Sequence, residues 1–210
     1  AEEAYGFNPK ECYPEAYHKI MPEYLNDRDF IEPEFKDYMK LMNSRGVTTV
    51  KEMGFDDFYG FDSFLKEKEE KKELSLRTFF MSQPVGEGIN IEHGKRMREK
   101  FQGDFVRFSG YNRMTDGTVA STKGDLLEPY EGTNMHCSIK VDYPMIEKEV
   151  KLADENGFRY SLHAQGDGAV HKVADIFDKC QKKDGKLVNR HAVTDMEFSN
   201  PADLKKMGEI

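Results

Sequence analysis

The sequence contains no tryptophan and little cysteine. The three cysteines, Cys12, Cys137 and Cys180, lie far apart and form no CxxC pair. An odd number of widely spaced cysteines does not build the disulfide framework of a small secreted domain. We therefore expect a cytoplasmic protein.

Long apolar runs are also absent. No stretch approaches the roughly 20 apolar residues that a helix needs to span a bilayer. The first residues, AEEAYGF, have neither the basic start nor the apolar core of a signal peptide. We expect no membrane association. Because the sequence has no starting Met, we also expect it to be a piece of a longer protein.

The chain lacks an excess of positive charge. Its 39 acidic residues outnumber 31 Lys and Arg residues, which gives a net charge of -8, and no basic stripe interrupts this pattern. Nucleic acid is therefore excluded as an expected partner. Neither a P-loop nor a dinucleotide-binding fingerprint occurs, because the GEG at Gly86 does not lead from a strand into a helix. A nucleotide-dependent enzyme is disfavoured.

What the sequence does contain is an alternation of helical and extended patterns. Its 210 residues fit one domain, residues 1–210. Apolar residues at three- and four-residue spacing predict helices, and short runs rich in β-branched and aromatic residues predict strands. The predicted helices are 14–25, 33–45, 61–73, 92–102, 144–156, 168–182 and 200–210. Asn200 is expected to cap the last of these helices, with Pro201 at its first position. The predicted strands are 47–53, 74–81, 104–110, 158–164 and 187–196.

This alternation predicts an α/β fold with a parallel sheet and outer helices, either doubly wound or a barrel. All the strands should run in the same direction. Barrel closure needs eight strands, so a sheet of about five leaves open edges. We expect the chain to form homo-oligomers through these edges.

Parallel strands bring their carboxyl ends to one face, where ligands bind. Four chemically suggestive residues are predicted to lie at such ends: Glu52, Arg107, His163 and Asp195. A lone histidine at a strand end is more often structural than a ligand, so both interpretations of His163 stay open at this point. No HxH, HExxH or CxxC motif supplies a self-contained metal site.

The remaining motifs have simple structural explanations. Asp116 and the glycine after it fit a turn that follows a strand. Asp167 is placed to cap the helix that begins near Gly168, with orientation of a neighbouring histidine or substrate as the alternative. His171 is predicted to lie on the surface or to pack against a neighbour. His191, inside a predicted strand, is interpreted as a wall or core residue.

Several stretches together resemble the amidohydrolase superfamily, and most closely its family 3, the metal-dependent hydrolases similar to N-substituted formamide deformylase. The similarity runs from about Asn43 to the end of the chain. The segment HAQGDGAV is its most specific part. The stretches that carry the resemblance are SRGVTTVKEMG, GDFVRF, TDGTVAS, EPY, ADENGFRYSLHAQGDGAVHKVADIF and NRHAVTDMEFSNPADLKKMG.

The resemblance implies a (β/α)8 barrel of the TIM type with an attached β-sandwich, and one or two divalent metals at the strand ends. By this likeness the chain is a partial barrel, roughly strands two to six. The first strand, the last strands and the β-sandwich of the family are missing. The implied metal ligands are His163 and Asp195, with Asp116 and Arg107 facing the substrate.

Two positions depart from the family pattern. Arg107 stands where the family strand carries a metal-bridging lysine, and a guanidinium stays cationic and cannot bind a metal. Thr194-Asp195 stands where the family has Glu-His, which exchanges an imidazole for a harder carboxylate. The full-length parent is thus expected to use a divalent metal, most simply zinc, whereas this chain has too few ligands to hold one firmly.

These observations predict a hydrolase of carbon–nitrogen bonds in non-peptide amides, acting on a small-molecule substrate. On its own, the 210-residue chain is expected to be an inactive fragment of that enzyme. The alternative is a non-catalytic protein that binds a small molecule on the same barrel, as the loss of the family's lysine and histidine would suggest.

Overall fold

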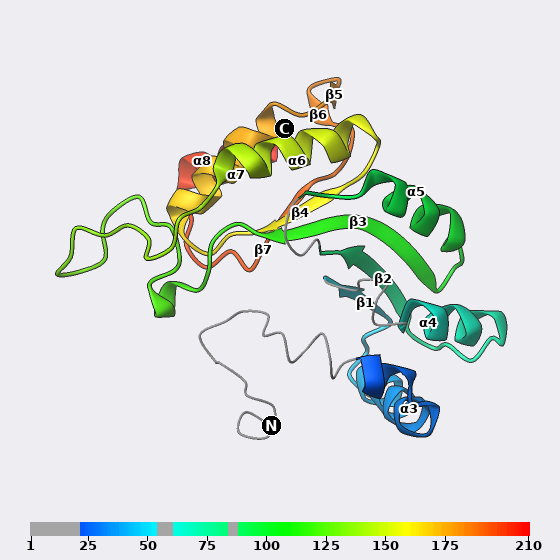
Figure 1. Cartoon of the computed structure of the whole chain (residues 1–210). Helices are drawn as coiled ribbons and strands as arrows, with labels where there is room; N and C mark the ends of the chain where they lie inside the picture. Colours follow the sequence, from blue (N-terminus) through cyan, green and yellow to red (C-terminus); the bar gives the residue numbers. More distant parts are fainter. Residues whose placement is uncertain (1–21, 54–60, 84–87) are drawn as a thin grey trace. The chain divides into compact units, whose positions relative to one another are not determined.

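The computed structural model describes residues 22–53, 61–83 and 88–210 (Figure 1). Five of its strands form one sheet in the order β1-β2-β3-β4-β7. The pairs β1–β2, β3–β4 and β4–β7 are parallel, which confirms the predicted parallel sheet. These strands are β1 (Thr49–Glu52), β2 (Arg77–Ser82), β3 (Val106–Met114), β4 (Tyr160–His163) and β7 (Ala192–Thr194).

Helices separate the strands, as the sequence pattern predicts. Most of the predicted helix 14–25 lies outside the described residues. They are α3 (Arg28–Ser44), α4 (Phe61–Glu70), α5 (Ile91–Lys100), α6 (Tyr143–Glu155), α7 (Asp167–Asp178) and α8 (Pro201–Glu209). Asn200 caps α8 as predicted, because its side chain accepts a hydrogen bond from the N–H of Asp203. No helix in the described part of the chain is both long and apolar enough to cross a membrane.

One element was not predicted. A two-stranded antiparallel hairpin, β5 (Lys182–Lys183) and β6 (Lys186–Leu187), follows α7 at the junction of the predicted helix 168–182 and the predicted strand 187–196. Its turn residues, Asp184 and Gly185, both have positive φ, which is the geometry that favours an Asp-Gly pair between two strands. The helix therefore ends at Asp178 rather than near Lys182.

The chain divides into two compact units. One comprises Ala1–Met81 and Arg98–Phe108, and the other comprises Ser82–Met97 and Ser109–Ile210. Strand β3 contributes to both. Whether the chain behaves as a single domain stays a prediction.

Aromatic rings pack α3 against α4 in the first unit. Phe35 of α3 meets the rings of Phe61 and Phe64 edge-on, with centroids 5.6 and 5.4 Å away. Near the end of α4, the Glu69 carboxylate accepts hydrogen bonds from the backbone N–H of Val106 and of the residue before it. These contacts join α4 to the first residues of β3.

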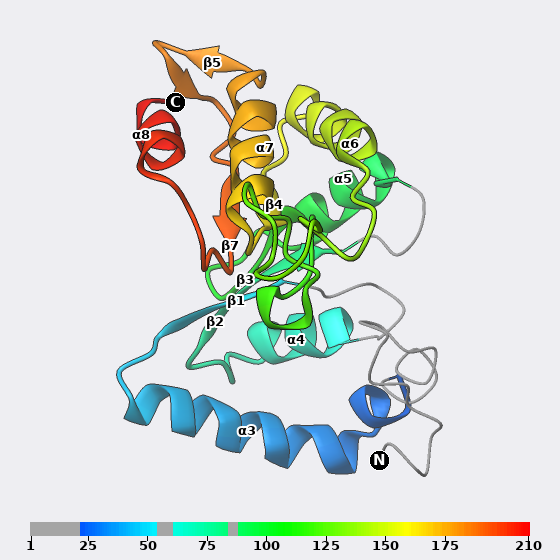
Figure 2. The same ribbon diagram turned by 90° about the vertical axis from the view of Figure 1, so that its left-hand side faces the viewer.

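In the second unit, α6 packs against β4 and α7, and α8 packs against α7 (Figure 2). Helix α7 buries a stripe of side chains at three- and four-residue spacing, which is the pattern expected of a helix with one face in the core. The fully buried members of this stripe are Ala169, Val170, Val173 and Ala174.

Buried polar contacts define the two faces of the sheet in this unit. Arg113 of β3 binds both oxygens of Glu149 on α6, at 2.6 and 2.8 Å, and the Tyr160 hydroxyl donates to the same carboxylate at 2.8 Å. Arg113 and Tyr160 therefore face the helices. Because side chains alternate along a strand, Asn112 and His163 face the opposite side.

A substitution at Gly110 tests the close approach of β3 to the backbone before β4. Its φ is +114°, and a Cβ at this position would lie 2.1 Å from the carbonyl oxygen of Arg159. We predict that Gly110→Ala lowers the free energy of unfolding by about 3 kcal/mol, from backbone strain plus the forced displacement of β4. Urea denaturation followed by circular dichroism measures this change.

Gly208→Ala is the matched control, because nothing lies within 4 Å of a Cβ at that position of α8. It should leave stability within about 1 kcal/mol of the original protein or raise it. Equal stability of the two variants would contradict the proposed close contact between β3 and β4.

Candidate functional site

The candidate site lies where β3, β4 and β7 end in the second unit. His163 is the last residue of β4, and its register partners are Met114 at the end of β3 and Thr194 at the end of β7. The residue is only 6% exposed. His163 thus stands at a strand end, on the face away from α6, as the sequence predicts; its role as a ligand stays a prediction.

Asp116 lies beside His163 and holds two loops together. Its Oδ1 accepts a hydrogen bond from the N–H of Gln165, and its Oδ2 accepts from those of Gly166 and Asp125, all at 2.9–3.0 Å. One loop follows β3 and the other follows β4. The side chain is fully buried, and its hydrogen bonds position the backbone of both loops. The expectation that Asp116 also faces a substrate stays a prediction.

The Oδ1 atom of Asp116 also lies 3.6 Å from Nδ1 of His163. This separation is too long for a hydrogen bond, and Nδ1 has no hydrogen-bond partner among the described residues. A carboxylate offers about four acceptor positions. Backbone N–H groups occupy three of them, and one position remains on Oδ1, the oxygen nearer His163.

The loop after β3 is seated on the first turn of α7. The carbonyl oxygen of Asp125 accepts the N–H of Ala169 at 3.0 Å. A Cβ on Gly166 would lie 2.0 Å from that same carbonyl oxygen, so only glycine permits the approach. The loop is thereby held close to the turn that follows His163.

Asp167 differs from its predicted role. The N-cap of α7 is Gly166, and Asp167 is the first residue of the helix. Its carboxylate accepts the N–H of Leu127 at 2.9 Å. The predicted cap is therefore wrong: the side chain binds the loop after β3 instead of its own helix.

Buried polar atoms without partners gather around His163. Each lies at or next to the carboxyl end of β3, β4 or β7. Leaving such an atom unpaired costs about 1–3 kcal/mol, so a cluster of them indicates a missing partner. Five buried side-chain atoms lack a hydrogen-bond partner among the described residues, and four of them belong to this group: Asn112 Oδ1, Thr115 Oγ1, His163 Nδ1 and Thr194 Oγ1. The fifth, Arg159 Nε, precedes β4 at the opposite end of that strand. We call these four residues the unpaired polar cluster.

Arg107 is not part of this site. It is the second residue of β3, at the amino end of the strand, because β3 continues to Met114. Its Nε donates to the carbonyl oxygen of Gly103 at 2.7 Å, and its guanidinium lies 3.6 Å from Asp104. The prediction that Arg107 sits at a carboxyl end and faces a substrate there is wrong.

The residue that sequence reasoning missed on this strand is Asn112. The prediction ended the strand at Gly110, since glycine usually interrupts a strand. Asp195 does follow β7 directly, as predicted, and its side chain is exposed. Glu52 ends β1 in the other unit and is also exposed.

A second cluster with metal-ligand chemistry lies at the opposite ends of the strands. The ligand atoms of Asp154, Cys180 and His191 lie within 4.8 Å of one another. His191 immediately precedes β7, and its side chain is fully buried, in agreement with its prediction as a wall or core residue. Its ring stacks on Phe177 with centroids 5.1 Å apart.

The chemistry of this second cluster does not suit a metal ion. His191 Nδ1 accepts the N–H of Tyr160, so Nε2 carries the proton and donates to Asp154 at 3.1 Å. A metal on Nε2 would require the ring to lose that proton as well. Burial raises the pKa of the Cys180 thiol to about 12, so the thiolate that binds metals is absent at neutral pH.

The cluster instead carries structural hydrogen bonds. Burial opposes ionisation of Asp154, but hydrogen bonds from Asn189, the N–H of Gln181 and His191 outweigh burial and lower its pKa. Burial also lowers the pKa of His191. A neutral histidine and an ionised aspartate thus join the end of α6 to the start of β7.

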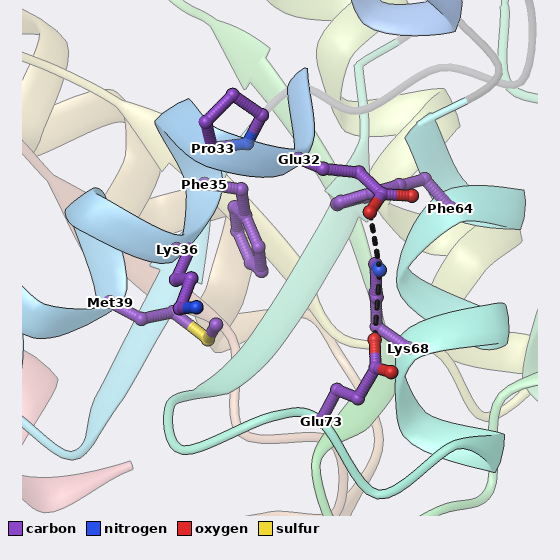
Figure 3. A pocket seen from close by; sticks show the side chains of 8 residues that line it. All are labelled: Glu32, Pro33, Phe35, Lys36, Met39, Phe64, Lys68 and Glu73. Atoms are coloured by element: carbon purple, nitrogen blue, oxygen red, sulfur yellow. Dashed lines mark hydrogen bonds and ion pairs between the residues drawn. The ribbon is translucent and has the colours of Figure 1, made fainter. Parts of the chain in front are cut away.

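The first unit contains a separate hollow of about 630 Å³ between α3 and α4 (Figure 3). Phe35 and Phe64 contribute its apolar lining. Lys68 lies between Glu32 and Glu73, with Nζ–O distances of 3.2 and 2.8 Å. No strand end contributes to this hollow, so it does not resemble a catalytic site of a parallel barrel.

Comparison with known proteins gives distant relatives. No family model matches the chain. It is 24% identical over 165 residues to "Exoenzymes regulatory protein AepA" of Pectobacterium carotovorum subsp. carotovorum, a match that covers 77% of this chain and 35% of that protein. It is 21% identical over 184 residues to "Protein LONG AFTER FAR-RED 3" of Arabidopsis thaliana, with 80% and 30% covered. The chain thus spans about a third of the length of these relatives.

Solved structures share its fold. An uncharacterized metal-dependent hydrolase from Pyrococcus furiosus matches with a TM-score of 0.71 and 18% identity, over 99% of this chain and 44% of that one. A second uncharacterized metal-dependent hydrolase, from Pyrococcus horikoshii OT3, matches with a TM-score of 0.65 and 17% identity, over 98% and 43%. The fold class is a partial parallel (β/α) barrel of the TIM type, as predicted.

The second cluster predicts a specific response to acid. The folded protein keeps His191 neutral because its pKa is lowered from 6.5, whereas the unfolded chain protonates it normally. Stability should therefore fall as the pH drops through 6.5, until the folded state also takes up the proton. We predict that His191→Asn is less stable at neutral pH but loses less stability between pH 7.5 and 5.5 than the original protein does.

Denaturation at both pH values measures the difference. Cys180→Ala is the control within the same cluster, because a thiol with a pKa of about 12 does not titrate in this range. That variant should keep the original pH dependence. An unchanged pH dependence in His191→Asn would show that His191 does not carry it.

Proposed function

We propose that the chain carries the central part of a metal-dependent hydrolase that cleaves carbon–nitrogen bonds in non-peptide amides. The observation that supports this most strongly is the buried, unpaired Nδ1 of His163 at the end of a parallel strand. The metal-dependent hydrolases with the same fold support the hydrolytic chemistry, and the HAQGDGAV segment supports the amide substrate.

The geometry around His163 suits a divalent ion. Two ligand atoms on one tetrahedral ion, each about 2.1 Å from it, lie about 3.4 Å apart. The His163 Nδ1 and Asp116 Oδ1 atoms are 3.6 Å apart, and each has an unused acceptor position. We propose that these two residues would hold the ion, with the carboxylate of Asp195 as a further oxygen ligand.

A bound divalent ion lowers the pKa of water and polarises a carbonyl group. The protein's own residues supply the surroundings. The backbone N–H groups on Asp116 hold its carboxylate in place, and the buried position of His163 keeps bulk water from the imidazole. The hydroxyls of Thr115 and Thr194 offer hydrogen bonds to a polar ligand.

A second candidate is a protein that binds a small amide without cleaving it. The small number of metal ligands favours this candidate. His163 is the only imidazole in the unpaired polar cluster, and catalytic zinc sites usually have three protein ligands. The two candidates share the same ligand face and differ in whether a metal-dependent reaction follows binding.

Zinc titration tests the metal site in the 210-residue chain. We predict weak binding, in the micromolar range or above, because fewer than three firm ligands are present. His163→Ala should weaken it about 10-fold or more. His171→Ala is the control, because His171 is 41% exposed and binds Asp203 on α8; it should leave zinc affinity unchanged. Zinc binding that survives His163→Ala would contradict the proposed site.

Hydrolysis tests the activity. N-formyl and N-acetyl anilines are suitable non-peptide amides, assayed with zinc for the 210-residue chain and for the protein encoded by the complete gene. We predict background rates for the chain alone. The complete protein should be active, with kcat/KM lowered about 100-fold or more by His163→Ala. Metal-independent activity, or full activity of His163→Ala, would reject the hydrolase and leave the binding candidate.

A further inference from the structure

Asn112 is the member of the unpaired polar cluster whose hydrogen-bonding role is most restricted. It lies near the end of β3, 4% exposed, on the same face of the sheet as His163. Its Nδ2 donates to Oε1 of Gln83 at 3.1 Å, whereas its Oδ1 has no partner among the described residues. The Gln83 contact fixes the amide so that it presents only an acceptor.

We propose that Asn112 is a specificity-determining residue whose Oδ1 accepts a hydrogen bond from the N–H of a ligand bound beside His163. The inference rests on the proposed function, since it uses the same ligand face, and it names the class of ligand: primary and secondary amides. Tertiary amides, which have no N–H, are rejected.

The register of the strands supports this placement. Asn112 pairs with Ser161 and His163 pairs with Met114, so Asn112 and His163 are diagonal neighbours on one face. Neighbouring strands lie about 4.8 Å apart and two residues along a strand span about 6.6 Å, so diagonal neighbours are about 8 Å apart and a small group can bind between them. The oxygen and nitrogen of an amide are only about 2.3 Å apart, so its carbonyl can point toward His163 while its N–H points toward Asn112.

Among the members of the unpaired polar cluster, Asn112 is the one that can distinguish ligands with an N–H from ligands without one. The hydroxyls of Thr115 and Thr194 rotate and can donate or accept, so they tolerate either kind of ligand atom. The Asn112 oxygen can only accept. A ligand without a donor leaves this buried oxygen unpaired, which reduces its affinity about 10-fold or more.

Two small probes separate the alternatives in the 210-residue chain. N-methylacetamide has one N–H, and N,N-dimethylacetamide has none. We predict that N-methylacetamide binds at least 10-fold more tightly, as measured by chemical-shift titration of ¹⁵N-labelled protein. Equal affinity for the two probes, or no binding of N-methylacetamide, overturns the proposal.

Variants of Asn112 assign the effect to its oxygen. Asn112→Leu has a similar shape without an acceptor and should abolish the preference. Asn112→Asp keeps the oxygen, and the Gln83 amide can rotate to donate to it, so the preference should return. Asn134→Leu, in an exposed loop, is the matched control and should keep the preference. If Asn112→Leu is folded, as denaturation would show, a preference for N-methylacetamide that persists in it overturns the proposal. If Asn112→Leu is not folded, the same preference is measured in Asn112→Asp, and its loss there overturns the proposal.

Zinc titration of Asn112→Leu distinguishes this inference from the proposed function. We expect zinc affinity to stay within 2-fold of the original protein, because Asn112 is assigned to the ligand and not to the ion. A parallel loss of zinc binding would make Asn112 a metal ligand and overturn the inference. Loss of zinc binding in His163→Ala alone concerns the proposed metal site and leaves the preference for the N–H as a separate result.

Discussion

The Asp116 carboxylate is the interaction on which the candidate site depends. It is buried and binds the backbone N–H groups of Gln165, Gly166 and Asp125, which belong to the loops after β3 and β4. Hydrogen bonds to an ionised group contribute about 1.5–3 kcal/mol each. If the Asp116 carboxylate were removed, these three backbone N–H groups would lose their hydrogen-bond acceptor. One side chain from the loop after β3 therefore holds the turn that follows His163 in place.

The parallel register complements this local constraint. Because His163 pairs with both Met114 and Thr194, the ends of three strands are level, and Asn112, His163 and Thr194 present their side chains to the same face. Helix α6 covers the other face, where Arg113 and Tyr160 satisfy Glu149. Arg113 thus has its partner on the helix side, whereas the unpaired atoms of Asn112 and His163 lie on the face that we propose binds a ligand. This difference between the two faces follows from the alternation of side chains along each strand.

Much of the fold could be predicted because each element carries its own local signal. Hydrophobic periodicity predicted the alternation of strands and helices, and the sequence Asn200-Pro201 predicted the cap of α8. The error at Arg107 arose at Gly110, which was interpreted as the end of a strand. Its positive φ instead allows β3 to continue past a close contact with Arg159, a tertiary contact that no local pattern contains. The predicted helix cap at Asp167 was wrong for a similar reason, because the N–H that its carboxylate binds belongs to Leu127, which is distant in the sequence.

The candidate site was only partly predictable for the same physical reason. The sequence identifies His163 as a residue at a strand end and Asp116 as part of a turn after a strand, but the loop contacts of Asp116 and the role proposed for Asn112 depend on long-range pairing. The hairpin after α7 is a different case, since its Asp184-Gly185 turn is a recognisable local signal that the helical pattern before it obscured. Long-range pairing, rather than weak local propensity, accounts for the more important omissions.

Two buried histidines at opposite ends of the sheet show how surroundings decide a residue's role. His191 has a partner on each ring nitrogen, the N–H of Tyr160 and the carboxylate of Asp154, so its imidazole is fully used in holding the fold. His163 is equally buried, yet its Nδ1 has no partner in the described part of the chain, and the nearest carboxylate oxygen keeps one acceptor position unused. A buried imidazole without a partner is stable only if something else completes its bonding. The unmet bonding at His163, and not the presence of a histidine as such, is what distinguishes the end of the sheet where we propose a ligand from the end where His191 holds the fold.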